Sequence, residues 1–227
     1  MTKSSKRHTD NKDLVDAEKR YDLEEAITIL KDATNAKFEE SIDVAINLGI
    51  DGKLSDQNVR GSAILPNGSG KNMRIVVFAE GEDADAAKSA GADEVGMDDL
   101  AEKIKSGYSD FELVISTPSS MKIVGQLGQI LGPKGVMPNP KDGTVTKNIK
   151  DAVNNAKKGQ AMFRNDKGGI IHCSIGKLNF SEQAIKENFR SLIDEIKKNR
   201  PASAKGVFIK MITLSSTMGP GLKLKES

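Results

Sequence analysis

Hydrophobic and polar positions change their spacing along the chain, and this change predicts a helix followed by strands. Residues 22–30 carry apolar side chains at helical spacing, behind Asp22 as the expected N-cap. Residues 42–50 then alternate between apolar and polar, which is typical of a strand with one face in water. Residues 59–65 are predicted to be the partner of that strand.

The same style of pattern returns late in the chain. It predicts a strand over residues 169–175, a capped helix over residues 181–198 and a final strand over residues 207–214. The two ends of the chain are therefore expected to build one α+β domain together.

The middle of the chain is patterned differently. Residues 75–79 and 113–115 are short, continuous apolar runs, as expected for strands that are buried on both faces. Helical patterns lie between them at residues 83–90 and 98–105, and Gly91 is expected to end the first. This βαβα order predicts a parallel sheet with helices on both faces.

The predicted fold class is therefore α/β combined with α+β, in two domains. An outer two-layer α+β domain is expected from residues 1–66 and 160–227, and a three-layer α/β/α Rossmann-like domain from residues 67–159 is inserted in it. The two crossings, near residues 66–72 and 157–160, are short, so they could act as a hinge.

The charge of the chain is uneven, although its net value is only +2. Residues 79–112 have a net charge of −8, whereas residues 122–158 and 197–227 have net charges of +5 and +6. Basic stretches beside an acidic one suit a protein that presents selected faces to phosphate. Ordinary solvated helix faces explain the same charges equally well.

Composition argues against several classes of protein. No apolar run approaches the roughly 20 residues of a membrane span, and residues 1–11 lack the apolar stretch of a secretion signal. Cys173 is the only cysteine, and there are two histidines, so we expect no disulfide, no Cys/His zinc site and no cofactor. With 4% aromatic residues and no Trp, stacking of bases on an aromatic platform is not expected.

Residues 123–140 contain the most distinctive run of the chain. A helical pattern is followed by Gly132, Pro133, Lys134 and Gly135, and two more prolines come after these. This content of Gly and Pro predicts a shaped loop that begins at Gly132. The loop offers bare backbone and two lysines, Lys134 and Lys141, but no general base or nucleophile, so contact with a polyanion suits it better than catalysis.

A nucleotide-dependent enzyme that uses the inserted domain is the alternative function. Residues 67–72 resemble a phosphate-binding loop, but Leu65 and Asn72 stand where that motif needs Gly and Ser or Thr. Residues 78–83 carry acidic side chains where a pyrophosphate would sit. We therefore expect a protein that is not an enzyme.

Two further segments are candidates for RNA contact. Residues 164–169 have turn chemistry, which predicts a hairpin tip, and Lys167 could contact RNA from it. His172, in the following strand, could be structural. Residues 215–221 are expected to follow the last strand without extending the sheet. Their hydroxyls and backbone could bond to phosphate and to the 2′-OH of RNA, or they could be a simple chain end.

Five segments, in this order, resemble the bacterial large-subunit ribosomal protein L-one family, the protein of the mobile side stalk beside the tRNA exit site. They are residues 55–61, 123–140, 164–167, 169–172 and 216–221. The resemblance covers about residues 20–222.

The resemblance implies an RNA-binding structural protein that acts as a monomer within the ribosome, in the cytoplasm. It implies contact with large-subunit rRNA, help in releasing tRNA from the exit site, and repression of the protein's own operon through its mRNA. The residues that it implies for rRNA contact are Lys37, Phe38, Asp166, Lys167, His172, Ser215, Thr217, Met218 and Gly219. Phe38 could equally belong to the core. A second RNA contact is expected from the loop that contains Gly132, Lys134, Gly135 and Lys141.

Overall fold

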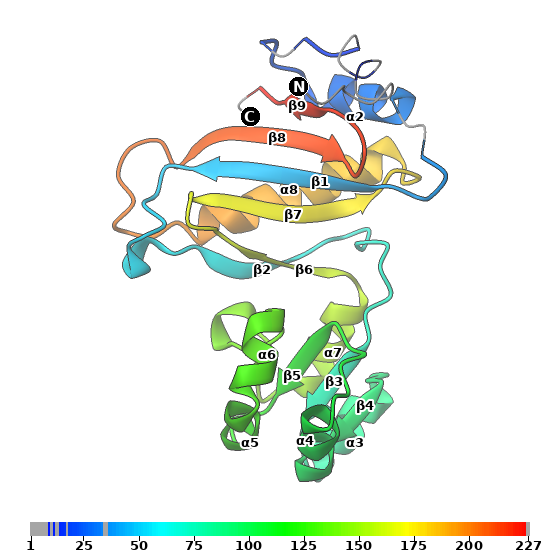
Figure 1. Cartoon of the computed structure of the whole chain (residues 1–227), viewed down its shortest axis with the longest axis vertical. Coiled ribbons are helices and arrows are strands. Elements are labelled where there is room, and N and C mark those ends of the chain that lie inside the picture. Colours follow the sequence, from blue (N-terminus) through cyan, green and yellow to red (C-terminus); the bar gives the residue numbers. More distant parts are fainter. Residues whose placement is uncertain (1–8, 10, 12–13, 17, 34–35, 226–227) are drawn as a thin grey trace, which may run out of the picture. The chain divides into compact units, whose positions relative to one another are not determined.

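The computed structural model describes the chain except residues 1–8, 10, 12–13, 17, 34–35 and 226–227. The chain divides into two compact units, one formed by Met1–Gly70 with Ala161–Ser227 and the other by Lys71–Gln160 (Figure 1). Both units combine helices with strands, so the predicted mixture of α and β structure is confirmed.

The first unit contains a four-stranded antiparallel sheet in the order β7-β1-β8-β9. Its strands are β1 (Ser41–Leu48), β7 (Ile170–Lys177), β8 (Ile209–Ser216) and β9 (Gly221–Lys223). Buried and partly exposed residues alternate along the whole of β1, which confirms the predicted strand with one face in water.

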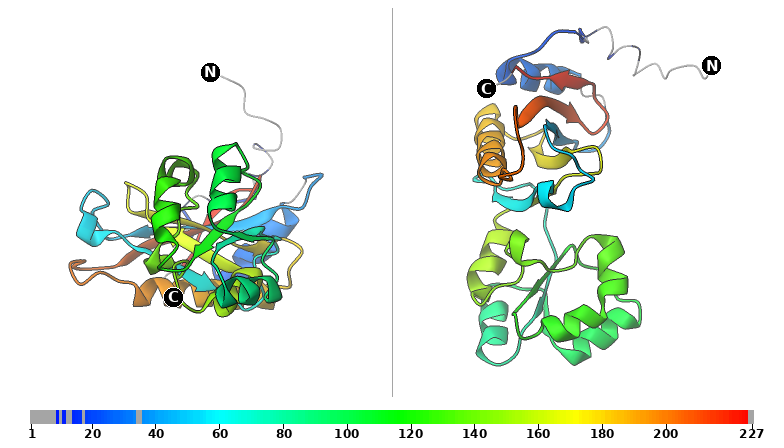
Figure 2. Two further views of the ribbon diagram at one scale, coloured as in Figure 1. Left: turned by 90° about the horizontal axis from the view of Figure 1, so that it is seen from below. Right: turned by 90° about the vertical axis from the view of Figure 1, so that its left-hand side faces the viewer.

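Two helices cover the apolar face of this sheet, α2 (Leu23–Asp32) and α8 (Glu182–Lys198) (Figure 2). The stripe of Ala26, Ile27 and Leu30 on α2 is buried in the same core cluster as the inward residues of the strands. Ser181 caps α8 by accepting a hydrogen bond from the amide of Ala184 (3.2 Å), as predicted. In Figure 1, α8 passes behind β1 and β7, so that view looks onto the opposite face of the sheet.

The predicted partner of the first strand is wrong. β2 (Arg60–Ile64) pairs with β6 (Gln160–Arg164) in a separate two-stranded sheet. Both edges of β1 are already occupied by β7 and β8. Asn165 also ties the start of β2 to the end of β6, because its side-chain oxygen accepts from the Val59 amide (2.8 Å) and its own backbone amide donates to the Val59 carbonyl (3.0 Å).

The predicted end of the sheet is also wrong. β8 continues to Ser216, and β9 returns beside it with Ser215 opposite Gly221. The two ends of the segment 215–221 therefore extend the sheet, and residues 217–220 join them. A tight turn makes this possible, because the amide of Gly219 donates to the carbonyl of Ser216 (3.3 Å).

The second unit has a three-stranded parallel sheet in the order β4-β3-β5. Every residue of β3 (Ile75–Phe78) and β5 (Leu113–Ser116) is buried, as predicted for strands with both faces covered. β4 (Glu94–Gly96) was not predicted. Its three residues are too few to show a strand pattern.

Helices pack on both faces of this second sheet, as the βαβα order predicted. One face contacts α4 (Asp98–Lys105), α5 (Met121–Gln126) and α6 (Gly128–Lys134), and the other contacts α3 (Glu82–Ser89) and α7 (Ile149–Lys157). Gly91 follows α3 with a positive φ of 90°, consistent with its expected role as a helix stop. The short helices η1 (Ser55–Gln57) and η2 (Pro140–Asp142) complete the described elements.

The predicted start of the Gly/Pro loop is wrong. α6 continues through Gly132 and Pro133 to Lys134 and ends at Gly135, which has a φ of 74°. The amides of Gly135 and Val136 donate back to the carbonyls of Gly132 and Leu131, which is the hydrogen-bond pattern of a Schellman motif. These two bonds stabilise the last turn despite the proline.

Candidate nucleic-acid interface

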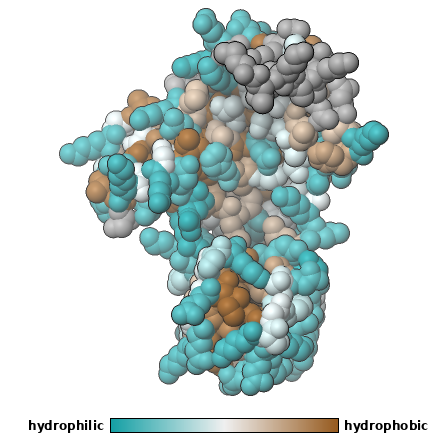
Figure 3. All heavy atoms as spheres, in the orientation of Figure 1, coloured by the Kyte–Doolittle hydropathy of each residue, from teal (hydrophilic) through white to brown (hydrophobic). Residues whose placement is uncertain are grey.

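The uncovered face of the four-stranded sheet carries mostly small side chains, together with the larger His172. Asp43 of β1 lies between Ser174 of β7 and Ser215 of β8, and Ala45 lies between His172 and Thr213. These residues alternate with the buried ones and are partly or fully exposed. In Figure 3 much of the sheet surface is pale, between teal hydrophilic rims. A ligand backbone could therefore approach this face closely.

A turn between β6 and β7 borders one end of this face. The predicted turn is confirmed, but it is not the tip of a hairpin of two paired strands, because β6 and β7 belong to different sheets and an isolated antiparallel bridge joins Asn165 to Ile171. Asp166 shapes the turn, because its Oδ1 accepts from the amides of Ile170 and Gly168, each at 2.8 Å. These two hydrogen bonds stabilise the charged carboxylate and hold the pKa of Asp166 below its usual value. The bond from the Ile170 amide has the larger effect, and the bond from the Gly168 amide has the smaller one. His172 is exposed, with its Nε2 3.8 Å from Oδ2 of Asp166, and Lys167 is exposed at the tip.

The segment that joins β8 to β9 borders the opposite end of the face. Thr217 forms three hydrogen bonds with the first residue of β1. Its amide and its hydroxyl both donate to the carbonyl of Ser41 (3.1 and 3.4 Å), and its Oγ1 accepts from the Ser41 amide (3.0 Å). The amide of Met218 and the hydroxyl of Ser216 both donate to the carboxylate of Glu40, at 3.0 and 2.6 Å. The backbone of this end is therefore fixed on both sides.

Two large apolar side chains are exposed at this end. Phe38 is 54% exposed and Met218 is 49% exposed, and Lys37 beside Phe38 is exposed as well. The sequence left open whether Phe38 belongs to the core, and the structure places it at the surface. Exposed apolar side chains beside fixed backbone suit contact with a partner.

The predicted rRNA contacts of the first unit therefore lie along one sheet, from one end of its strands to the other. Thr217 adjoins the first residue of β1, Asp166 lies by the turn that leads into β7 at the other end, and His172 is paired with Ala45 between them. A strand of eight residues such as β1 spans roughly 25 Å. The arrangement is an extended surface and not a point site.

The second predicted contact lies in the second unit. Gly132, Lys134, Gly135 and Lys141 are all exposed. A side chain added at Gly132 or Gly135 would meet nothing within 4 Å, so packing does not explain these glycines. They leave backbone open to solvent at the end of α6.

Sequence reasoning missed Glu40, and it counted the hydroxyl of Ser216 among the candidate RNA contacts, whereas both residues are buried and bonded to each other. One signal could have found Glu40. It stands two residues before Ile42, in the inward phase of the alternating strand, and a carboxylate that faces a core needs hydrogen-bond donors around it.

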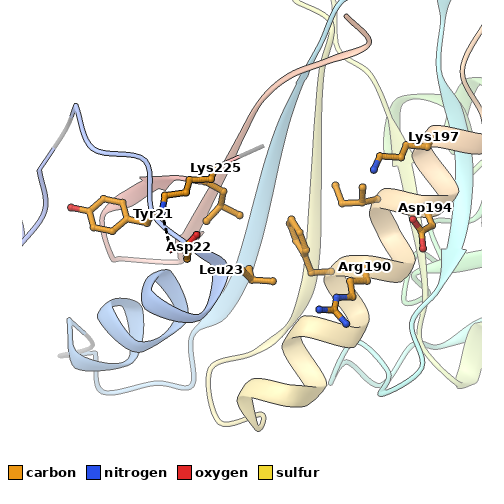
Figure 4. A pocket seen from close by; sticks show the side chains of 10 residues that line it. Tyr21, Asp22, Leu23, Arg190, Asp194, Lys197 and Lys225 are labelled. Carbon is orange, nitrogen blue, oxygen red and sulfur yellow. Dashed lines mark hydrogen bonds and ion pairs between the residues drawn. The ribbon is translucent and has the colours of Figure 1, made fainter. Parts of the chain in front are cut away.

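A pocket of about 270 Å³ lies in the first unit, between α8 and the start of α2 (Figure 4). Its apolar wall includes Leu23, Phe189, Ile193 and Leu224, and Lys225 forms an ion pair with Asp22 at its edge (2.8 Å). Because this pocket belongs to the first unit, it does not supply the nucleotide site that the enzyme alternative would need in the inserted domain.

Two other features, a metal site and a membrane-spanning helix, are absent from the described residues. Among them, no group of three or more His, Cys, Asp or Glu side chains could hold a metal ion. None of the described helices is both long enough and apolar enough to cross a membrane.

The fold and the surface define a protein whose main candidate site is an open sheet face, with a separate α/β unit inserted in the chain. A sequence model of the ribosomal protein L1p/L10e family matches residues 30–220. The chain belongs to this family. It is therefore a ribosomal protein, and it works on the ribosome, in the cytoplasm.

Two curated relatives extend the match over the whole chain. The large ribosomal subunit protein uL1 of Proteus mirabilis is 55% identical over 227 residues, which cover 100% of this chain and 97% of the relative. The protein of the same name from Photobacterium profundum is 56% identical over 226 residues, with the same coverage.

Proposed function

We propose that this protein is a structural, non-enzymatic component of the large ribosomal subunit, and that it binds large-subunit rRNA through the open face of its four-stranded sheet. The names of the two relatives support the subunit. The main observation that supports this interface is the fixed segment at the end of β8. There, hydrogen bonds connect Thr217 and Met218 to residues at the start of β1, and the exposed side chain of Phe38 lies nearby in the sequence.

The chemistry of this face suits RNA. Ser and Thr hydroxyls can donate to and accept from the 2′-OH of ribose, and small side chains let the wide, shallow minor groove of an A-form helix approach. Lys37 and Lys167 are exposed at the two ends of the sheet, where they can neutralise phosphates. Phe38 and Met218 can pack against unstacked bases.

The proposal also assigns the two domains different tasks. Residues 1–66 and 160–227 carry most of the rRNA affinity, and residues 67–159 carry the second contact around Gly132 and Lys141. This second contact is proposed to help release tRNA from the exit site. Repression of the protein's own operon follows if its mRNA presents the same RNA shape to the same face. One copy acts as a monomer within the ribosome.

Binding to fragments of large-subunit rRNA tests the proposed function directly. We expect a fragment that contains the side-stalk region to bind about tenfold or more tightly than DNA of the same sequence, because DNA lacks the 2′-OH. The affinity should fall as salt rises, with a slope of roughly −0.7 to −0.9 per neutralised phosphate. Equal affinity for RNA and DNA, or a flat salt dependence, would count against this interface.

Substitution of Thr217 tests whether the segment that joins β8 to β9 contributes to rRNA binding. Thr217→Val keeps the shape but removes the hydroxyl that accepts from Ser41, and we expect it to weaken rRNA binding by about 1–3 kcal/mol. Thr28→Val is the matched control, because Thr28 is exposed on α2, whose apolar stripe packs into the core beneath the other face of the sheet. Filter binding or calorimetry measures both variants. Wild-type affinity in a folded Thr217→Val protein would contradict the assignment.

A further inference from the structure

A buried carboxylate lies directly under the proposed RNA interface. Glu40 is only 2% exposed, and it precedes the first residue of β1. A negative charge next to a polyanion is unfavourable by Coulomb's law, and burying a carboxylate costs further free energy. Some contribution of Glu40 must therefore offset both costs.

The hydrogen bonds of Glu40 indicate what this contribution is. Ser216 donates its hydroxyl and Met218 donates its amide to one and the same oxygen, Oε2, at 2.6 and 3.0 Å. These two donors flank Thr217, which is itself bonded to Ser41. One acceptor atom thus fixes the backbone on either side of a predicted RNA contact.

The space around Ser216 shows how tightly this segment is packed. A Cβ atom added at Gly219 would lie 2.4 Å from the Ser216 Oγ and 3.7 Å from a methyl group of Leu30. The hydroxyl therefore sits directly against the backbone of Gly219. If Glu40 released this hydroxyl, both the hydroxyl and the turn would be free to move.

We propose that Glu40 is a positioning residue for RNA binding. Its Oε2 holds residues 216–219 in the shape that presents Thr217 and Met218 to RNA, and it acts as a hydrogen-bond acceptor and not through its charge. The inference rests on the proposed function, and it adds a residue that makes no contact with the RNA.

Two variants of Glu40 separate the acceptor from the charge. Glu40→Gln and Glu40→Met both remove the charge and nearly keep the side-chain length, but only Gln retains an oxygen that can accept from both donors. We expect Glu40→Gln to bind the rRNA fragment within about threefold of wild type, and Glu40→Met to bind about tenfold or more weakly. The backbone amide signals of Met218 and Gly219 in NMR spectra should move in Glu40→Met and stay close to wild type in Glu40→Gln.

The outcomes distinguish this inference from the proposed function. A wild-type protein that does not bind the fragment would overturn both. If wild type binds, equal affinities of the Gln and Met variants would overturn the proposed positioning of the segment by the acceptor oxygen of Glu40, and the proposed function would stand. This holds whether both variants bind well or both bind poorly. If Glu40→Met does not fold, Ser216→Ala replaces it, since it removes one of the two donors with little change in volume. We expect about fivefold weaker binding from Ser216→Ala, and unchanged binding would overturn the proposal.

Discussion

Replacing Gly219 with alanine is expected to lower the affinity for rRNA about 100-fold, or about 2.8 kcal/mol. The new Cβ would lie 2.4 Å from the Ser216 hydroxyl, closer than two such atoms can approach. The hydroxyl cannot move away without breaking its 2.6 Å bond to the buried carboxylate of Glu40, and a buried charge that loses a donor is costly. The turn must therefore shift, and Thr217 and Met218 shift with it.

Gly221→Ala is the matched control for this substitution. Gly221 is two residues away in β9, but its added Cβ would meet only a methyl group of Thr213, at an ordinary contact distance of 3.4 Å. We expect this variant to bind within about threefold of wild type. Equilibrium binding to the rRNA fragment, with circular dichroism to verify the fold, measures both variants. Equal affinities for the two alanine variants would contradict a tightly packed turn.

Replacing Phe78 with alanine is expected to cost the second unit about 3–5 kcal/mol of unfolding free energy, because a large, fully buried side chain leaves a cavity. Phe78 belongs to the core cluster around α4, α5 and α6 and makes no part of the core of the first unit. We therefore expect the rRNA affinity to stay within about tenfold of wild type.

Phe163→Ala is the counterpart in the first unit, since Phe163 of β6 is buried in the core of that unit. We expect the Phe163→Ala substitution to destabilise the first unit. It should abolish rRNA binding at every urea concentration at which this unit is unfolded. Two measurements test the Phe78→Ala and Phe163→Ala variants. Hydrogen exchange follows the urea unfolding of each unit, and rRNA binding is measured at each urea concentration. If Phe78→Ala lost far more affinity than Phe163→Ala, the primary RNA contact would lie in the second unit.

Local patterns predicted most of the elements, because each depends on residues close in sequence. The alternation in β1, the Ser181 cap of α8 and the fully apolar β3 are features of this kind. Strand pairing is not local. β2 pairs with β6 because Asn165, more than 100 residues further along the chain, bonds to Val59, and no pattern near residue 59 reveals this.

Pro133 illustrates the same limit within a helix. Proline usually disrupts a helix interior, so the sequence favoured a loop from Gly132. The return hydrogen bonds from Gly135 and Val136 stabilise the last turn of α6, and they depend on a left-handed conformation that only the structure shows.

The candidate interface was predictable mainly through the family resemblance. The resemblance indicated Thr217, Met218 and Lys37, but the residues alone left Phe38 undecided between surface and core. Phe38 lies outside every helix and strand, so no periodic pattern indicates which way its side chain faces. Glu40 was missed because a carboxylate near an expected RNA contact looks like an ordinary solvated charge until its burial is known.

The pairing of β9 has a consequence for the order of events during synthesis. Leu222 and Leu224 are buried in the core of the first unit, beside residues such as Tyr21 that are made just over 200 residues earlier. Residues 71–160 can fold as soon as they leave the exit tunnel, since their contacts lie within one continuous segment. The first unit must wait until Leu224 has emerged. We therefore expect a nascent chain to carry a folded inserted domain between two unfinished ends, with its RNA-binding face completed only as translation of this segment finishes.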